Sequence, residues 1–199
     1  MGFVICEYEK VKEELSWFKE KMAAMESALV SKARRDWAPL TFGGIKPSAG
    51  QFGKTTIMPQ LFYGFGGLAT GSRLTTWKNY LSATGSQTLM EGAATGGTIA
   101  EDYKIGLIGL AFLDKTLRVT EIKMQIGDRK LPRINIEEAM AYNKPAIIFE
   151  DYYILDEEAG FELVGYVEAI GYQTIKLIGI QLNRVPNKLQ VTNTGAALT

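Results

Sequence analysis

The stretch Ser48–Thr55, SAGQFGKT, comes within one residue of a phosphate-binding loop. Such a loop needs a glycine, four further residues and then Gly-Lys-Ser or Gly-Lys-Thr, and the closing Gly-Lys-Thr fits. Ser48 stands where the first glycine should be, and Pro47 precedes it where a buried strand is needed. Downstream, β-branched residues and Pro59 predict a strand or a turn, whereas phosphate binding requires a helix N-terminus. We therefore predict that this segment binds no nucleotide.

Few other residues have the types that catalysis requires. Histidine is absent and Cys6 is the only cysteine, which excludes Ser-His or Cys-His pairs and thiol-rich metal sites. An acidic run within Glu150–Glu158 is compatible with a divalent cation or with a solvated turn. Nothing in the sequence raises Lys54 or Lys104 above an ordinary surface lysine. We expect no catalytic residues, no cofactor and no metal, and a protein that is not an enzyme.

The charges are balanced, with 22 basic and 22 acidic side chains, so no overall excess attracts nucleic acid. The N-terminus becomes acidic before any long apolar run develops, unlike a signal peptide. The longest apolar run, residues 105–113, has about half the length of a membrane-spanning helix. The sequence predicts a cytoplasmic origin, no transmembrane segment and at most weak contact with nucleic acid.

The N-terminal segment is predicted to be one long helix, because no glycine or proline interrupts it between Phe3 and Ala38. Apolar residues follow alternating steps of four and three, the spacing of a coiled-coil seam. Two interpretations stay open: the helix packs on its own domain, or the seam meets another subunit. In the second case the oligomer interface consists of Val11, Leu15, Phe18, Met22, Met25 and Leu29. Residues 1–39 are thus a helical arm.

The following segment, about residues 37–100, holds more than half of the chain's 21 glycines and few charges. Its glycine-rich stretches predict turns and extended loops between short strands. The aromatic side chains are too many for a disordered segment, so we expect contacts to order these loops. These aromatic side chains are either core residues or anchors for neighbouring chains. A third alternative, a surface for single-stranded nucleic acid, agrees less well with the low charge of the segment. The interface loops are predicted at Phe62, Tyr63, Phe65 and Trp77.

The remainder, up to about Arg184, reads as a series of strands with one short helix after Asn135. No strand–helix–strand alternation occurs, which argues against a parallel sheet. The predicted fold is mainly β: an antiparallel β-sandwich or single jelly roll over residues 40–184, with a long N-terminal α-helix and one short helix. Residues 185–199 are polar or small and are predicted to be a free C-terminal tail.

This organisation resembles a small viral coat protein, in which an N-terminal arm precedes a jelly-roll shell domain. The short helix INIEEAMAYN (residues 134–143) and the closing strands FELVGYVEAI and TIKLIGIQL carry the resemblance. It implies a capsid subunit that assembles with copies of itself through helix, loop and strand-edge contacts. It also implies a virion location after assembly in the host cytoplasm, with other virion proteins as further partners. The arm holds seven basic and seven acidic residues, so we expect little genome binding by it.

A second hypothesis is a β-sandwich binding module, in which residues 62–73, FYGFGGLATGSR, recognise a carbohydrate or a protein partner. A third is an enzyme that depends on carboxylates or a metal, with Glu150 or Asp151 as its essential residue. The mass of the protein in solution separates the first hypothesis from the second.

Overall fold

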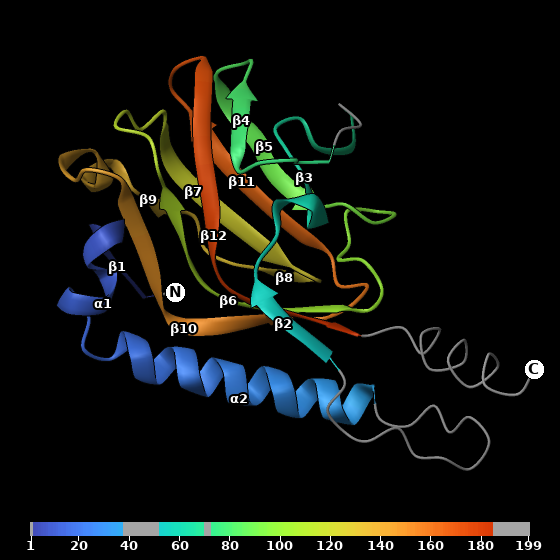
Figure 1. Cartoon of the computed structure of the whole chain (residues 1–199). Helices are drawn as coiled ribbons and strands as arrows, with labels where there is room; N and C mark the ends of the chain where they lie inside the picture. Colours follow the sequence, from blue (N-terminus) through green and yellow to red (C-terminus); the bar gives the residue numbers. More distant parts are fainter. Residues whose placement is uncertain (1, 38–51, 70–72, 185–199) are drawn as a thin grey trace, which may run out of the picture.

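Two antiparallel sheets of six strands each pack against one another, and a helix lies across the outer surface of the first sheet (Figure 1). The computed structural model describes residues 2–37, 52–69 and 73–184. The expectation of a mainly β protein built from antiparallel sheets is therefore confirmed.

The first sheet has the order β1-β10-β6-β12-β2, and β4 also pairs with β12. Strand β2 lies along Ile180–Arg184 and β4 along Gly171–Thr174, so the two short strands share one edge of the long β12. The strands are β1 (Phe3–Glu7), β2 (Phe52–Thr56), β4 (Lys78–Leu81), β6 (Tyr103–Phe112), β10 (Pro145–Leu155) and β12 (Gly171–Arg184).

The second sheet has the order β3-β5-β11-β7-β8, and β9 also pairs with β7. Its strands are β3 (Phe62–Tyr63), β5 (Gly85–Gly92), β7 (Val119–Ile126), β8 (Arg129–Lys130), β9 (Ile134–Asn135) and β11 (Phe161–Val167). Short 3₁₀ helices interrupt the connections: η2 (Pro59–Leu61), η3 (Gly67–Ala69) and η4 (Glu137–Ala141). The short helix expected after Asn135 is thus a 3₁₀ turn, whose first N–H, that of Glu137, donates to Asn135 Oδ1 at 2.8 Å.

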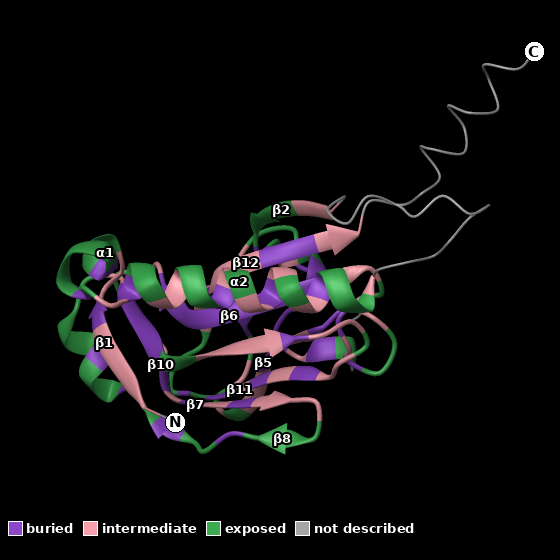
Figure 2. Ribbon diagram, turned by 90° about the horizontal axis from the view of Figure 1, so that it is seen from below, coloured by how far each residue is buried: buried purple, intermediate pink, exposed green. Residues whose placement is uncertain are grey.

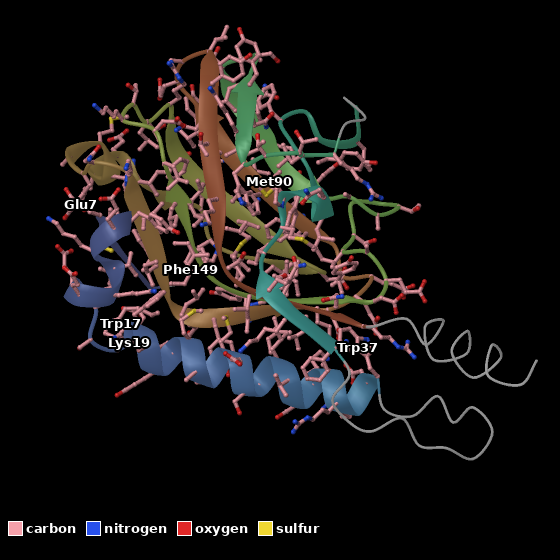
Figure 3. The ribbon with its side chains drawn as sticks, in the orientation of Figure 1. Glu7, Trp17, Lys19, Trp37, Met90 and Phe149 are labelled. Atoms are coloured by element: carbon pink, nitrogen blue, oxygen red, sulfur yellow. The ribbon has the colours of Figure 1, made fainter. Side chains whose placement is uncertain are left out.

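The main core fills the space between the sheets. Met90 of β5 and Phe149 of β10, labelled in Figure 3, both belong to it. Strand β6 is buried along almost its whole length, because one face meets this core and the other lies beneath helix α2 (Phe18–Asp36). Gly106 allows this close approach: a Cβ atom there would lie 2.9 Å from Met25 Cγ.

The long N-terminal helix is not seen, and this prediction was wrong. The segment forms β1, a 3₁₀ turn η1 (Tyr8–Lys10), a single turn α1 (Val11–Glu14) and then the separate helix α2. The apolar residues of β1 pair with the edge of β10, with Val4 opposite Ile148. A heptad-like spacing does not distinguish these arrangements, because β-branched residues fit a free sheet edge at least as well as a helix. Within residues 2–37, β1 thus extends the first sheet, and α1 and α2 pack against it.

Helix α2 presents its buried side to the sheet and its exposed side outward, as Figure 2 shows in a view onto the helix. It ends at Asp36, before Pro39, where the sequence predicted the end of the helix. In the described segments, no helix combines the length and apolar character needed to cross a membrane. The predicted tail, residues 185–199, lies outside the described residues.

Candidate functional site

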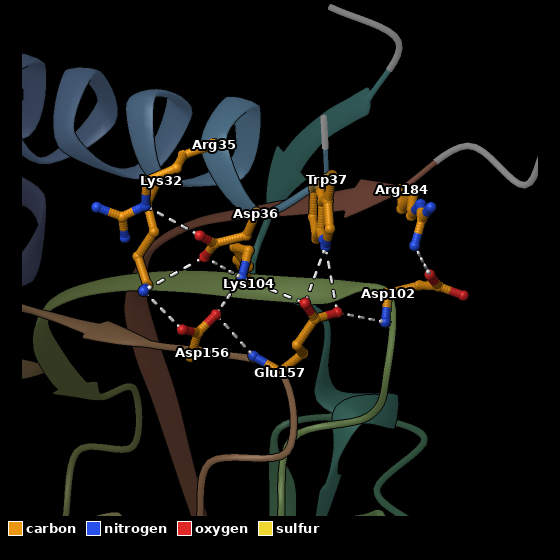
Figure 4. Close-up of polar contacts among 9 residues, drawn as sticks. All are labelled: Lys32, Arg35, Asp36, Trp37, Asp102, Lys104, Asp156, Glu157 and Arg184. Carbon is orange, nitrogen blue, oxygen red and sulfur yellow. Dashed lines mark hydrogen bonds and ion pairs between the residues drawn. The ribbon is translucent and has the colours of Figure 1, made fainter. Parts of the chain in front are cut away.

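Among the described residues, the densest group of charged side chains surrounds Lys104, the second residue of β6 (Figure 4). Its side chain is 1% exposed, and its ammonium group lies 3.0 Å from Asp36 Oδ2 and 3.5 Å from Glu157 Oε1. The same ammonium group also donates a hydrogen bond to Asp156. Lys104 starts in β6, Asp36 ends α2, and the other two carboxylates follow β10, so one buried cation joins three elements.

Further contacts complete this cluster, which we call the Lys104 network. Lys32 of α2 lies 3.3 Å from Asp36 and 2.7 Å from Asp156. Trp37 Nε1 donates to both carboxylate oxygens of Glu157 at 3.2 Å, and its ring centroid lies 5.3 Å from Lys104 Nζ. With Arg35 bonded to Asp36 at 3.1 Å, three cations face three carboxylates. The charges of the network therefore cancel.

The electrostatics of the network keep its groups charged. Burial alone would lower the pKa of Lys104, but hydrogen bonds to Asp156 and Asp36 outweigh burial and raise it. Burial would likewise raise the pKa of Asp36, but hydrogen bonds from Lys104, Arg35 and Lys32 lower it to about 2. The lysine is thus protonated at neutral pH and has no lone pair for nucleophilic attack. The network holds the end of α2 against the sheet.

The acidic run is divided between two places. Asp156 and Glu157 serve the Lys104 network, which leaves them no role as cation ligands. Glu150 and Asp151 lie instead near Lys21, whose Nζ donates to the Glu150 carbonyl at 2.5 Å and is 3.8 Å from Asp151. Among the described residues, no group of three or more side chains is arranged to hold a metal ion.

The segment that resembles a phosphate loop continues into a strand. Lys54 lies in β2, opposite Leu182 of β12, and its Nζ is 2.5 Å from Glu26 of α2. Residues 48–51 lie outside the described residues. The part that follows Gly53 is an edge strand, so it offers no helix N-terminus to a phosphate group.

The predicted helix seam packs within the chain. Five of its residues, Val11, Leu15, Phe18, Met25 and Leu29, are buried against the outer surface of the chain's own first sheet. Met22 is half-buried and lines a cavity in the same layer. Of the two interpretations left open by the sequence, this arrangement agrees with the one in which the segment packs on its own domain. The buried seam leaves little surface for another subunit.

The predicted interface loops also contribute to the core. Phe62 is fully buried, with its ring centroid 5.4 Å from that of Phe161 and 6.1 Å from that of Trp77. Phe65 is buried, whereas Tyr63 and Trp77 are half-buried. These aromatic residues anchor the β3 region to the sandwich, one of the alternatives left open by the sequence.

Sequence reasoning missed one exposed aromatic pair. Tyr80 of β4 and Tyr172 of β12 lie opposite one another in register, with their ring centroids 5.0 Å apart. They are 49% and 58% exposed, and Lys78 Nζ lies 4.6 Å from the Tyr172 ring centroid. We call Tyr80 and Tyr172 the exposed tyrosine pair. Only the pairing of β4 with the distant β12 brings these residues together, and no local sequence pattern indicates that pairing.

No family model, curated protein or solved structure matches the chain.

Proposed function

We propose that this chain is a structural subunit that assembles with copies of itself, as the coat subunit of a viral capsid, and that its sandwich is a jelly roll. A jelly roll winds eight strands so that the first, eighth, third and sixth form one sheet, and the second, seventh, fourth and fifth form the other. Its subunits are expected in a virion after assembly in the host cytoplasm, together with other virion proteins.

The order of the strands carries this proposal. Counting eight strands from β4 to β12, with β8 and β9 sharing the fifth place, the jelly-roll rule predicts the orders β4-β12-β6-β10 and β5-β11-β7-β8. The two sheets contain both orders. Strands β1, β2 and β3 then extend the edges of the sheets, and α2 covers the outer surface of the first one.

The burial of the helix seam moves the proposed subunit contacts to other surfaces. The exposed tyrosine pair is the first candidate, because two half-exposed aromatic rings next to each other favour contact with another protein surface. The free edge of β1 is the second, since an unpaired strand edge offers backbone donors and acceptors to another chain.

The test is the mass of the full-length chain in solution, measured by light scattering over a range of salt and protein concentrations and accompanied by electron microscopy. Closed particles or rings of many subunits are expected. A single species of 22.0 kDa under all conditions would overturn the proposal. Deleting the first 38 residues is not a useful test, because it removes β1 and α2 and exposes the core beneath them.

A paired variant then locates the contact. Replacing Tyr80→Ser and Tyr172→Ser together should reduce the particle mass, whereas Tyr142→Ser, at another exposed tyrosine beside η4, should leave it unchanged. Equal masses for the paired variant and the unmodified chain would move the contact elsewhere on the surface.

The exposed tyrosine pair also favours the second candidate, a binding module for a carbohydrate or a protein partner. Aromatic rings beside a cation are suited to stacking against a flat ligand face. This candidate predicts a monomer that binds an array of glycans, with binding lost in the paired tyrosine variant.

A further inference from the structure

A cavity of about 340 Å³ opens on the outer side of the first sheet, between the helices and β12. Its size falls within the range of small-molecule sites. Two irregularities create the space: the chain leaves helical geometry between α1 and α2, and β12 bulges between Ile178 and Gly179. The apolar lining comes from Val11, Phe18, Met22 and Ile178.

Two lysines line this cavity. Lys176 Nζ donates a hydrogen bond to the Tyr8 hydroxyl at 3.0 Å, and Lys12 is the second. Across the described residues, neither lysine has an ion-pair partner. The single carboxylate of the lining, Glu9, is bonded instead to Lys144 at 2.6 Å, and this hydrogen bond lowers its pKa. Among the described residues, the two lysines of the lining are therefore not neutralised by a carboxylate.

We propose that this cavity binds an amphipathic carboxylate, a single unbranched apolar chain with one anionic head group. The head group lies against Lys176, and the Tyr8 hydroxyl, which accepts from that lysine, directs its own hydrogen to a carboxylate oxygen. The apolar chain packs against Phe18, Met22 and Ile178. This inference does not depend on the proposed assembly.

The chain's own undescribed segments fit the cavity less well. Residues 38–51 and 185–199 contain no aspartate or glutamate, and each contains a lysine, Lys46 or Lys188. The side chains of these segments therefore offer the two lysines no carboxylate. Charge complementarity therefore favours a separate anionic ligand.

The first experiment is equilibrium dialysis of the full-length chain against radiolabelled decanoate, at concentrations below those at which it self-associates. Dialysis reports binding whether the protein is a monomer or a particle. Saturable binding is expected for decanoate, and none for decyltrimethylammonium, which has the same chain and the opposite charge. Equal binding of the two, or no saturable binding of decanoate, overturns the proposal.

Two matched variants then test the head-group contact. Lys176→Met removes the ammonium group but keeps an apolar side chain, and it should weaken decanoate binding by about tenfold or more, the loss expected for a charged hydrogen bond. Lys130→Met removes an exposed lysine from β8 of the second sheet, outside the cavity, and should leave binding unchanged. Unchanged binding in folded Lys176→Met protein, verified by its thermal unfolding, contradicts the proposal.

A photoreactive decanoate with a diazirine at its far end locates the apolar chain. Cross-links are expected in peptides that contain Met22 or Ile178, because both line the cavity. Cross-links that lie only elsewhere overturn the assignment. Binding that occurs in dissociated subunits but disappears in assembled particles would assign the cavity to a neighbouring copy, and this result also counts against the proposal.

Discussion

Lys104 Nζ and Asp36 Oδ2 lie 3.0 Å apart, and this contact joins a buried strand in the middle of the first sheet to the last turn of α2. The lysine is taken out of water within an otherwise apolar strand, so its charge is tolerated only because carboxylates surround it. Its partners come from α2 and from the end of β10, and the network therefore forms only when helix and sheet have both folded.

The first prediction concerns the loss of this cation. Lys104→Met leaves Asp36, Asp156 and Glu157 facing one another without the ammonium group between them. Removing one partner of a buried ion pair typically costs about 3–5 kcal/mol, which urea denaturation should detect as a lower free energy of unfolding.

A matched control is Lys54→Met, which breaks the exposed pair with Glu26. Both side chains of that pair are well exposed, at 51% and 41%, so the expected loss is at most about 1 kcal/mol. Similar losses for the two variants would show that the Lys104 network contributes no more than a surface ion pair.

The second prediction is a loss of stability in acid. The pKa of Asp36 is about 2 in the folded chain, below its ordinary value of 3.8, so the unfolded chain binds its proton first. This contribution to stability is complete well above pH 3.8 and is lost as the pH falls towards 2. The pKa of Asp156 is also lowered in the folded chain, so protonation of Asp156 likewise reduces the free energy of unfolding in acid.

Denaturant unfolding between pH 6 and 2 measures this effect. The free energy of unfolding should fall most steeply below about pH 4, and Asp36→Asn should flatten that fall because its amide does not titrate. An equally steep profile in Asp36→Asn protein would assign the acid sensitivity to other carboxylates.

The sandwich was predictable from the sequence, and the network was not. Strands β7, β10, β11 and β12 are visible as alternating or continuous apolar runs, because burial of a sheet face determines the pattern locally. Lys104 lies at the beginning of such a run, and its partners lie 52, 53 and 68 residues away along the chain. No local pattern encodes a contact over that distance.

In the N-terminal segment, too, the local sequence pattern does not determine the structure. Val4, Tyr8 and Val11 fit a helical repeat, yet Val4 lies in a strand, Tyr8 in a 3₁₀ turn and Val11 in a short helix. The exposed edge of β10 decides this outcome, since it provides hydrogen-bond partners to Phe3–Glu7. Tertiary pairing thus overrides local periodicity.

The third prediction tests the contact between α2 and β6. Gly106→Ala places a Cβ atom 2.9 Å from Met25 Cγ and 3.4 Å from Leu29 Cδ2, so the Met25 side chain or the helix itself has to shift. Overpacking of this kind costs about 1–3 kcal/mol. Gly160→Ala is the control, because only Gly127 Cα lies within 4 Å, at 3.9 Å. Equal thermal stabilities for the two variants would contradict close packing of α2.

The fourth prediction uses Cys6 as a reporter of β1. The thiol is buried beneath the helices, and burial, with a smaller contribution from Glu14, raises its pKa, so little thiolate forms. We expect a thiol reagent to modify the folded chain about 100-fold more slowly than the urea-unfolded chain, since reaction requires opening of β1. Equal rates would show that β1 does not stay paired with β10.

The fifth prediction decides what the helix seam does. Leu29 is fully buried beside Ala33 and Leu182, so Leu29→Ala removes contacts within one chain. It should lower the free energy of unfolding by about 2–5 kcal/mol, because a cavity remains where the side chain was. The mass of any particle formed by the folded variant should stay unchanged. A smaller particle, with unaltered unfolding of the dissociated subunit, would instead show that the seam meets a neighbouring copy.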